Sequence, residues 1–124
     1  MSNSILADLR KSAGSTADYD DYFDSQLIMH ANTLFALLIQ VGAGPENGFV
    51  VEDENTVWDD YFSQCANPED PKLRMAMSYV CIRTRLMFDP PSNSTLLQSL
   101  NDTAKELEWR LNVNYMETEG TDNG

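Results

Sequence analysis

The most regular pattern of apolar positions lies in residues 25–41. Seven apolar side chains there fall within a stripe of roughly 140° when residues are placed at about 100° intervals around a helix axis. They are Leu27, Ile28, Ala31, Leu34, Phe35, Leu38 and Ile39. Such a stripe predicts an amphipathic α-helix that buries one face. Asp24 is expected to cap its start, and Gly42 is expected to end it.

A second run, residues 72–88, is apolar on two sides rather than one. Pro71 suits the first turn of a helix, and Pro90 disfavours helical geometry at the residue before it. One side carries Leu73, Ala76, Met77, Val80 and Met87. A helix with two apolar sides is either central in its own domain or shared with a neighbouring subunit. The second side therefore supplies candidate inter-subunit residues, which are Met75, Tyr79, Ile82, Arg83 and Leu86.

The last helix is predicted to begin after Ser92 or Asn93, either of which can cap it. Its apolar stripe spans roughly 100° and consists of Leu96, Leu97, Leu100, Ala104, Leu107 and Leu111. Trp109 points about 160° away from the centre of that stripe, with Val113 and Met116 beside it. The helix therefore holds a large aromatic side chain on the face opposite its leucines.

Shorter elements complete the expected fold. Ser4 can cap a short first helix that Gly14 ends, and a helix of about two turns is expected to start near Asn55 or Thr56. The run FVVE is the only β-like stretch and is too short for more than the edge of a ribbon. We therefore predict an all-α helical bundle of four main helices, with a short extra helix and one long acidic loop. Residues 1–116 form a single domain in this prediction, and residues 117–124 form a disordered acidic tail.

Length and charge narrow the class of protein. A chain of 124 residues is most simply one domain, and it lacks an apolar run of about 18 residues and a signal-peptide core, so we expect no membrane contact. Its net charge is −12 and its pI is about 4.1. A free nucleic-acid-binding protein needs a basic surface, so this charge argues against that class. Cys65 and Cys81 lack metal-site spacing and are expected to be reduced thiols.

Catalytic and cofactor motifs were not found. His30 is the only histidine and falls at the edge of an apolar stripe, which favours a partly buried imidazole with its hydrogen bonds satisfied over a catalytic base. The stretch GAGPENG lacks the third glycine and the Lys-Ser/Thr of a phosphate loop. The acidic runs DYDDYFD and EDE lack calcium-loop spacing. We therefore expect no enzyme activity, no cofactor and no metal site.

Several short stretches, in their order along the chain, resemble the head–tail connector (adaptor) proteins of long-tailed bacteriophages. The break FDPP between two helices is followed by ELEWRL, as in members from phages of Gram-positive hosts. Upstream are a helix with IMH, the turn GAGP, the stretch FVVED and the run WDD. The resemblance covers roughly residues 4 to 115.

The resemblance implies a structural protein of the virion, made in the host cytoplasm. It implies a ring, usually of twelve copies, that docks beneath the portal protein, receives a stopper or tail-joining protein, and lets DNA pass without binding it specifically. The portal or a neighbouring subunit would contact the end of the last helix, at Trp109, Arg110, Val113, Asn114, Tyr115 and Met116. The acidic residues that are candidates to face the channel are Asp18, Asp20, Asp21, Asp24, Glu52, Asp53, Glu54, Asp59 and Asp60.

Two other classes stay open on the sequence. One is a small acidic helical binding protein, such as a DNA mimic or regulator, which would use its carboxylates to bind a basic partner. The other is an all-α metal-dependent nucleotide hydrolase, although Glu106 and Glu108 straddle the leucine stripe instead of forming an inward row.

Overall fold

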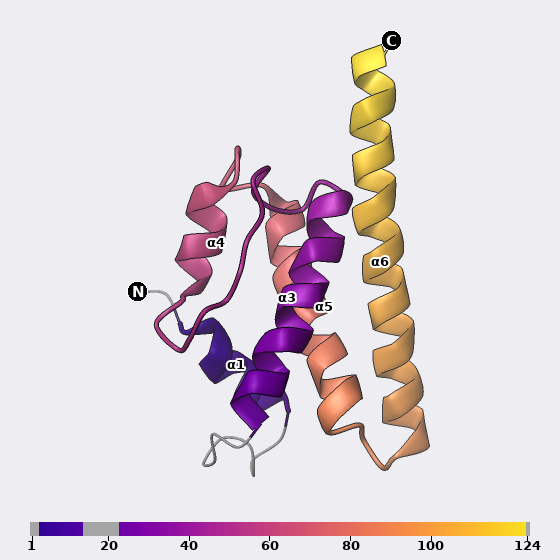
Figure 1. The fold of residues 1–124 in the computed structure, drawn as a ribbon. Coiled ribbons are helices and arrows are strands. Elements are labelled where there is room, and N and C mark those ends of the chain that lie inside the picture. The colour runs from indigo at the N-terminus through magenta and orange to yellow at the C-terminus, as the bar shows by residue number, and fades with distance from the viewer. Residues whose placement is uncertain (1–2, 14–22, 124) are drawn as a thin grey trace.

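The computed structural model describes the backbone of residues 3–13 and 23–123, and the side chains of residues 3–13 and 23–112. Within these ranges the chain forms five α-helices and no β-strand, which confirms the predicted all-α class. The helices are α1 (Ile5–Ser12), α3 (Asp24–Gln40), α4 (Trp58–Gln64), α5 (Pro71–Phe88) and α6 (Ser94–Asn123) (Figure 1).

Helix α5 is the central element. It packs against α1, α3 and α6, while α6 stands at one edge of the molecule and α4 at the opposite edge (Figure 1). Leu73, Ala76 and Val80 are buried on one side of α5, and Tyr79 is buried on the other. The first apolar side is therefore used inside the chain, and the second is used there only in part. Met87, which the pattern placed on an apolar side, is instead 61% exposed in the last turn of the helix.

The start of α3 differs from the prediction. The N-cap residue is Phe23, and Asp24 makes no capping hydrogen bond. Asp24 instead binds the guanidinium of Arg10, with Nε to Oδ1 at 2.9 Å and Nη2 to Oδ2 at 2.5 Å. A two-pronged charged contact of this kind is stronger than a single bond to a backbone N–H. The predicted cap is thus wrong because the carboxylate ties α3 to α1.

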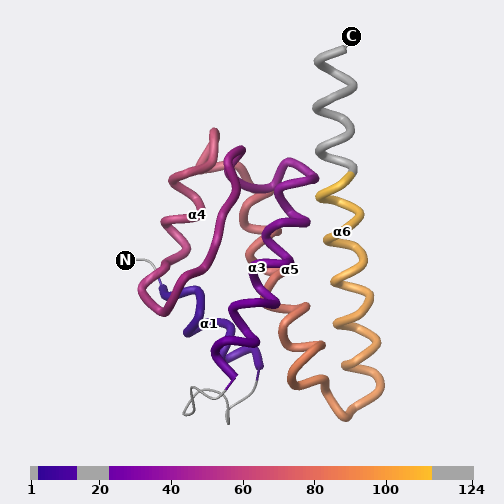
Figure 2. Tube along the Cα trace, viewed as in Figure 1, coloured from indigo at the N-terminus to yellow at the C-terminus, as the bar shows by residue number. Residues whose placement is uncertain are grey.

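An aromatic cluster joins α3, α4 and the loop between them. The Phe35 ring lies 5.0 Å from the rings of both Phe49 and Tyr61, and 6.1 Å from that of Trp58, measured between centroids. The Tyr61 hydroxyl donates a hydrogen bond to the carbonyl of Ala43. Buried aromatic pairs add to the stability that burial of their surface gives. This cluster fixes the course of the long loop, which Figure 2 follows from the end of α3 to the start of α4.

Helix α4 begins later than the predicted start near Asn55 or Thr56. The Thr56 hydroxyl accepts a hydrogen bond from the backbone N–H of Glu52 at 3.2 Å and therefore does not cap the helix. Val57 is the N-cap residue instead, and its N–H donates to Asp60 Oδ2 at 2.9 Å. The Ser4 cap of α1 is confirmed, since Ser4 Oγ accepts from the N–H of Ala7 at 3.2 Å.

Helix α6 follows the Pro90–Pro91 break and is capped by Asn93, whose Oδ1 accepts from the N–H of Leu96 at 3.0 Å. Ala104 and Leu111 are its buried positions, whereas Leu97, Leu100 and Leu107 are half-buried. The predicted stripe is therefore correct in its centre and too wide at its start, where Leu96 is 43% exposed. The expected boundary between a domain ending at 116 and a tail at 117–124 stays a prediction.

Candidate docking groove

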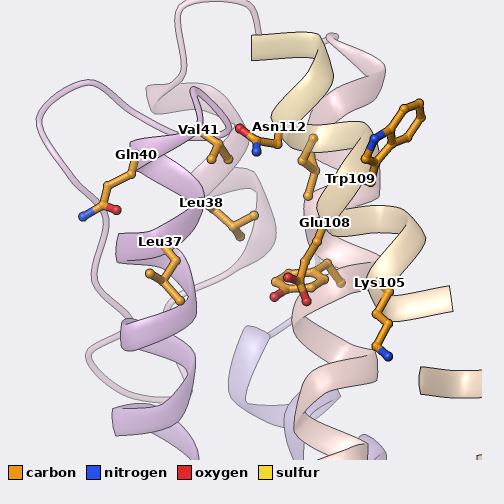
Figure 3. A pocket seen from close by; sticks show the side chains of 10 residues that line it. Leu37, Leu38, Gln40, Val41, Lys105, Glu108, Trp109 and Asn112 are labelled. Atoms are coloured by element: carbon orange, nitrogen blue, oxygen red, sulfur yellow. The ribbon is translucent and has the colours of Figure 1, made fainter. Parts of the chain in front are cut away.

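A largely apolar opening lies between α3 and α6, with α5 as its floor (Figure 3). Its volume is about 500 Å³. The walls come from the last turns of α3 and from α6 between residues 105 and 112. The lining residues are Leu37, Leu38, Gln40, Val41, Tyr79, Lys105, Glu108, Trp109, Leu111 and Asn112. We call this opening the α3–α6 groove.

Trp109 forms the outer wall of the α3–α6 groove and is 63% exposed. The helix positions it there because Leu111, two residues later and about 200° around the axis, faces the core and is 2% exposed. The sequence prediction that Trp109 points away from the core is thus confirmed. Leu37, 50% exposed, contributes an apolar side chain from the opposite wall. Figure 3 shows the Trp109 indole directed away from α3, so Trp109 lies at the rim of the opening and does not face Leu37. Exposed large apolar side chains beside an opening are typical of contact surfaces.

A polar network sets the floor of the groove. Arg83 Nε donates a hydrogen bond to the Tyr79 hydroxyl at 3.2 Å, and the same guanidinium is paired with Glu108 of α6. The Arg83 guanidinium carbon also lies 5.5 Å from the centre of the Tyr79 ring. Burial raises the pKa of Tyr79, so its phenol is neutral at physiological pH. The network holds α6 at a fixed spacing from α5 and occupies the Glu108 carboxylate.

The candidate inter-subunit residues on α5 lie in different environments. Tyr79 is buried and Arg83 is paired within the chain, so both already have partners. Met75, Ile82 and Leu86 are half-buried and keep part of their surface exposed. Whether a neighbouring subunit covers these three residues stays a prediction.

Arg110, beside Trp109 on α6, pairs with Glu106 one turn earlier, with Nη2 to Oε1 at 3.0 Å. Both side chains are more than half exposed, so the pair contributes little to stability. The side chains of the other predicted interface residues at this end lie outside the described residues; they are Val113, Asn114, Tyr115 and Met116.

The candidate channel acids separate into structural and free groups. Asp24 is held by Arg10, which Glu54 also approaches, with Nη1 to Oε2 at 3.6 Å. Asp53 and Asp60 each accept a hydrogen bond from a backbone N–H, and Asp59 also has an interaction partner. Glu52 is exposed, and among the described residues its carboxylate has no partner. Asp18, Asp20 and Asp21 lie outside the described residues.

Charge is segregated along the chain. Between Lys11 and Lys72 the sequence has twelve acidic residues and no lysine or arginine. These residues include α3, the long loop and α4, whereas α5 and α6 carry six of the eight basic residues. The edge at α4 is therefore acidic, whereas most of the cations lie on the central helix α5, and α6 carries two of them, Lys105 and Arg110. The second apolar side of α5 was identified from the sequence alone, but the absence of lysine and arginine between residues 12 and 71 was not.

His30 is half-buried, as predicted, but the prediction that its hydrogen bonds are satisfied is wrong for one ring nitrogen. Its ring meets Phe88 edge-on at 6.0 Å, and its Nε2 is buried without a hydrogen-bond partner. Desolvation lowers the pKa of His30. Among the described residues, no three His, Cys, Asp or Glu side chains are grouped to hold a metal ion.

Leu37 and Lys105 are groove residues that the sequence reading missed. Leu37 lies off the apolar stripe of its helix, as Trp109 does, so the test that identified Trp109 would also have identified Leu37. Nothing in the sequence marks Lys105, because its place at the groove depends on how α6 packs against α5.

Comparison with known proteins assigns the chain to a family. The model of a family described as phage connector protein matches residues 5–118. No curated protein and no solved structure matches the chain. No described helix has the length and apolar content that crossing a membrane requires.

Proposed function

This chain belongs to the phage connector protein family, and from that premise we propose that it forms a ring beneath the portal, where the phage head joins the tail. The ring extends the DNA channel and offers its far side to a stopper or tail-joining protein. The observation that carries the proposal is the family match, which spans nearly the whole chain.

The charge of the chain supports a role as a conduit. Lysine and arginine side chains bind DNA phosphates by releasing counterions, and a wall rich in them would retain a passing genome. The net charge of −12 gives a surface that repels phosphates instead. DNA then passes through the ring without specific binding.

The end of α6 supports a protein contact. Trp109 is 63% exposed beside an apolar groove, and tryptophan and arginine are the residues that most often dominate interfaces. In the proposed particle Trp109, Arg110 and the segment 113–116 contact the portal or a neighbouring subunit. The family resemblance implies twelve copies, and head-to-tail contacts between identical chains close into such a ring when the rotation per copy allows.

The net charge also predicts how the ring forms. Twelve copies at −12 each repel one another strongly at low ionic strength. We expect the isolated protein to be monomeric at low salt and to form rings at high protein concentration, at high salt, or on the portal.

The test is to mix the purified full-length chain with purified portal and to measure the mass of the product by native mass spectrometry. We expect a portal complex that carries a ring of this protein. A chain that stays monomeric with the portal under every salt condition contradicts the proposal.

The segregated acidic half favours one other candidate, an acidic protein that binds a basic partner. In that case the same experiment gives no portal complex, and a basic protein from the same cell binds at low salt and dissociates as salt rises. A connector does not require that basic partner.

A further inference from the structure

An extended segment in the long loop presents one face to solvent. Along residues 49–52, Phe49 and Val51 are buried, at 7% and 1% exposure, and Val50 and Glu52 between and after them are exposed. Val50 is 60% exposed, which makes it one of few large apolar side chains on the described surface. Alternate residues of an extended chain point the same way, so Val50 and Glu52 share this outer face.

The segment is held rigidly. The Asn32 side chain accepts a hydrogen bond from the backbone N–H of Val51 at 2.7 Å and donates one to its carbonyl at 3.2 Å. Asn32 therefore pairs with both polar groups of one residue, as a neighbouring strand would. With Phe49 in the aromatic cluster and Val51 in the core, little conformational freedom is left to lose when the outer face is covered.

The α3–α6 groove offers an apolar lining and a positive charge for this face. Its lining includes the apolar side chains of Leu37, Leu38 and Val41, with Trp109 at the rim, and its volume of about 500 Å³ exceeds that of a valine side chain. Lys105 lies at its edge and has no ion pair among the described residues, whereas Glu108 is already paired with Arg83. The groove thus has room for one apolar side chain and an unpaired cation for one carboxylate.

The segment and the groove belong to different sides of the molecule. Figure 1 places α4 and the loop before it on the side of α3 away from α6. A contact between the segment of one copy and the groove of another leaves a free groove on the first and a free segment on the second. Such a head-to-tail contact repeats, and it closes into a ring when the rotation per copy allows.

We propose that the outer face of residues 49–52 of one copy docks in the α3–α6 groove of the next copy, with Val50 against the apolar lining of the groove and with Glu52 beside Lys105. The proposal rests on the ring of the proposed function and names the surfaces that build it.

Disulfide trapping tests the contact. In the double variant V50C/N112C, one cysteine lies on the segment and the other in the groove, on an exposed residue that leaves Lys105 in place. After oxidation at high protein concentration and high salt, we expect a ladder of covalent oligomers on a non-reducing gel. The matched control is V50C/T103C, because Thr103 is exposed on the opposite face of α6. Both variants keep Cys65 and Cys81, so the difference between them reports the contact.

A charge placed on the segment gives a second measurement. Val50→Asp is expected to abolish ring formation by native mass spectrometry without changing the melting temperature, because Val50 is exposed. Met29→Asp is the control, since Met29 is 69% exposed on α3 and lies outside the groove.

The outcomes separate this contact from the function. If the wild-type chain forms rings while V50C/N112C gives no ladder and Val50→Asp assembles normally, the contact is wrong and the connector role stands. The groove would then hold the portal or another partner. If the wild-type chain forms no ring with or without the portal, both the contact and the proposed function are overturned.

Discussion

The indole of Trp58 donates a hydrogen bond from Nε1 to Asp8 Oδ2 at 2.7 Å, across fifty residues of sequence. Trp58 opens α4 and is 2% exposed, and Asp8 lies in the first turn of α1. Backbone bonds reinforce this link, because the N–H of Ile5 donates to the Thr56 carbonyl at 3.0 Å. The side-chain bond is therefore the polar anchor that attaches the first helix to α4.

We expect Asp8→Ala to lower the free energy of unfolding by about 1–3 kcal/mol, because it leaves the Trp58 N–H buried without an acceptor. Chemical denaturation monitored by circular dichroism measures the change. Asp102→Ala is the control, since Asp102 is exposed and accepts only from Gln98 on its own helix. An equal loss in both variants would show that the Trp58 bond contributes nothing specific.

In α6, Leu111→Ala is expected to cost about 2–5 kcal/mol, because Leu111 is 2% exposed and its removal leaves a cavity. Leu107→Ala is expected to cost less, since Leu107 is half-buried. Leu96→Ala should change stability by under about 0.5 kcal/mol, as exposed sites do. The three melting temperatures check the register of the helix, and the reverse order would show that the register is wrong.

The candidate channel acids should respond differently to substitution. Asp24→Ala is expected to destabilise the fold by about 1.5–3 kcal/mol, because it removes a charged hydrogen-bonded partner of Arg10. Glu52→Ala should leave thermal stability unchanged, because among the described residues its carboxylate has no partner. Thermal melting separates the two kinds of acid.

Replacement of channel-facing acids by lysine should slow DNA ejection while the fold stays intact, since exposed charges change stability little. Glu52→Lys, incorporated into particles, would be compared with wild type in ejection kinetics, and Asp53→Lys and Asp59→Lys would be added where their melting temperature is unchanged, because both carboxylates have partners in the fold. If every such particle ejects at the wild-type rate, the acidity of these residues serves solubility alone.

His30 should make stability depend on pH. Its pKa is lowered below the ordinary 6.5 by desolvation, so the unfolded chain binds a proton at higher pH than the folded chain does. Stability is therefore full above about 6.5 and falls as pH drops below it towards the folded-state pKa. Because His30 is the only histidine, His30→Asn should flatten the difference in melting temperature between pH 7.5 and pH 6. The same slope in wild type and variant would contradict the assignment.

Trp109→Ala should leave the melting temperature within about 1–2 °C of wild type, because the side chain is mostly exposed. It should also prevent assembly on the portal, since an exposed tryptophan in an interface contributes ~2 kcal/mol or more. Co-sedimentation with purified portal measures the loss, and Leu96→Ala serves as the control at the other end of α6. A variant that melts far lower and still assembles would place Trp109 in the core.

The helices could be predicted from sequence because each carries a local signal. The apolar stripe of α3, the first-turn Pro71 of α5 and the Asn93 cap of α6 depend only on neighbours within a turn or two. What could not be predicted depends on contacts across the chain. Asp24 pairs with Arg10 instead of capping α3, and the Thr56 hydroxyl accepts from the N–H of Glu52 instead of capping α4. Neither partner is marked by spacing in the sequence.

For the candidate site, too, only the feature with a local signal could be predicted from the sequence. Trp109 was identified by its angle on a single helix, whereas Lys105 and Leu37 become groove residues only through the way α3 and α6 both rest on α5. The Asn32–Val51 pairing had no sequence signal at all, because an asparagine inside a helix and a valine in a loop meet only in the folded chain.

The two tryptophans give the molecule separate optical reporters. Trp58 is buried in the aromatic cluster, whereas Trp109 is exposed to solvent. Trp58 therefore emits at a shorter wavelength than Trp109 and is less accessible to a dissolved quencher. Unfolding red-shifts the emission of Trp58, whereas burial in a partner blue-shifts that of Trp109. A single spectrum can therefore distinguish a subunit that has docked from one that has come apart.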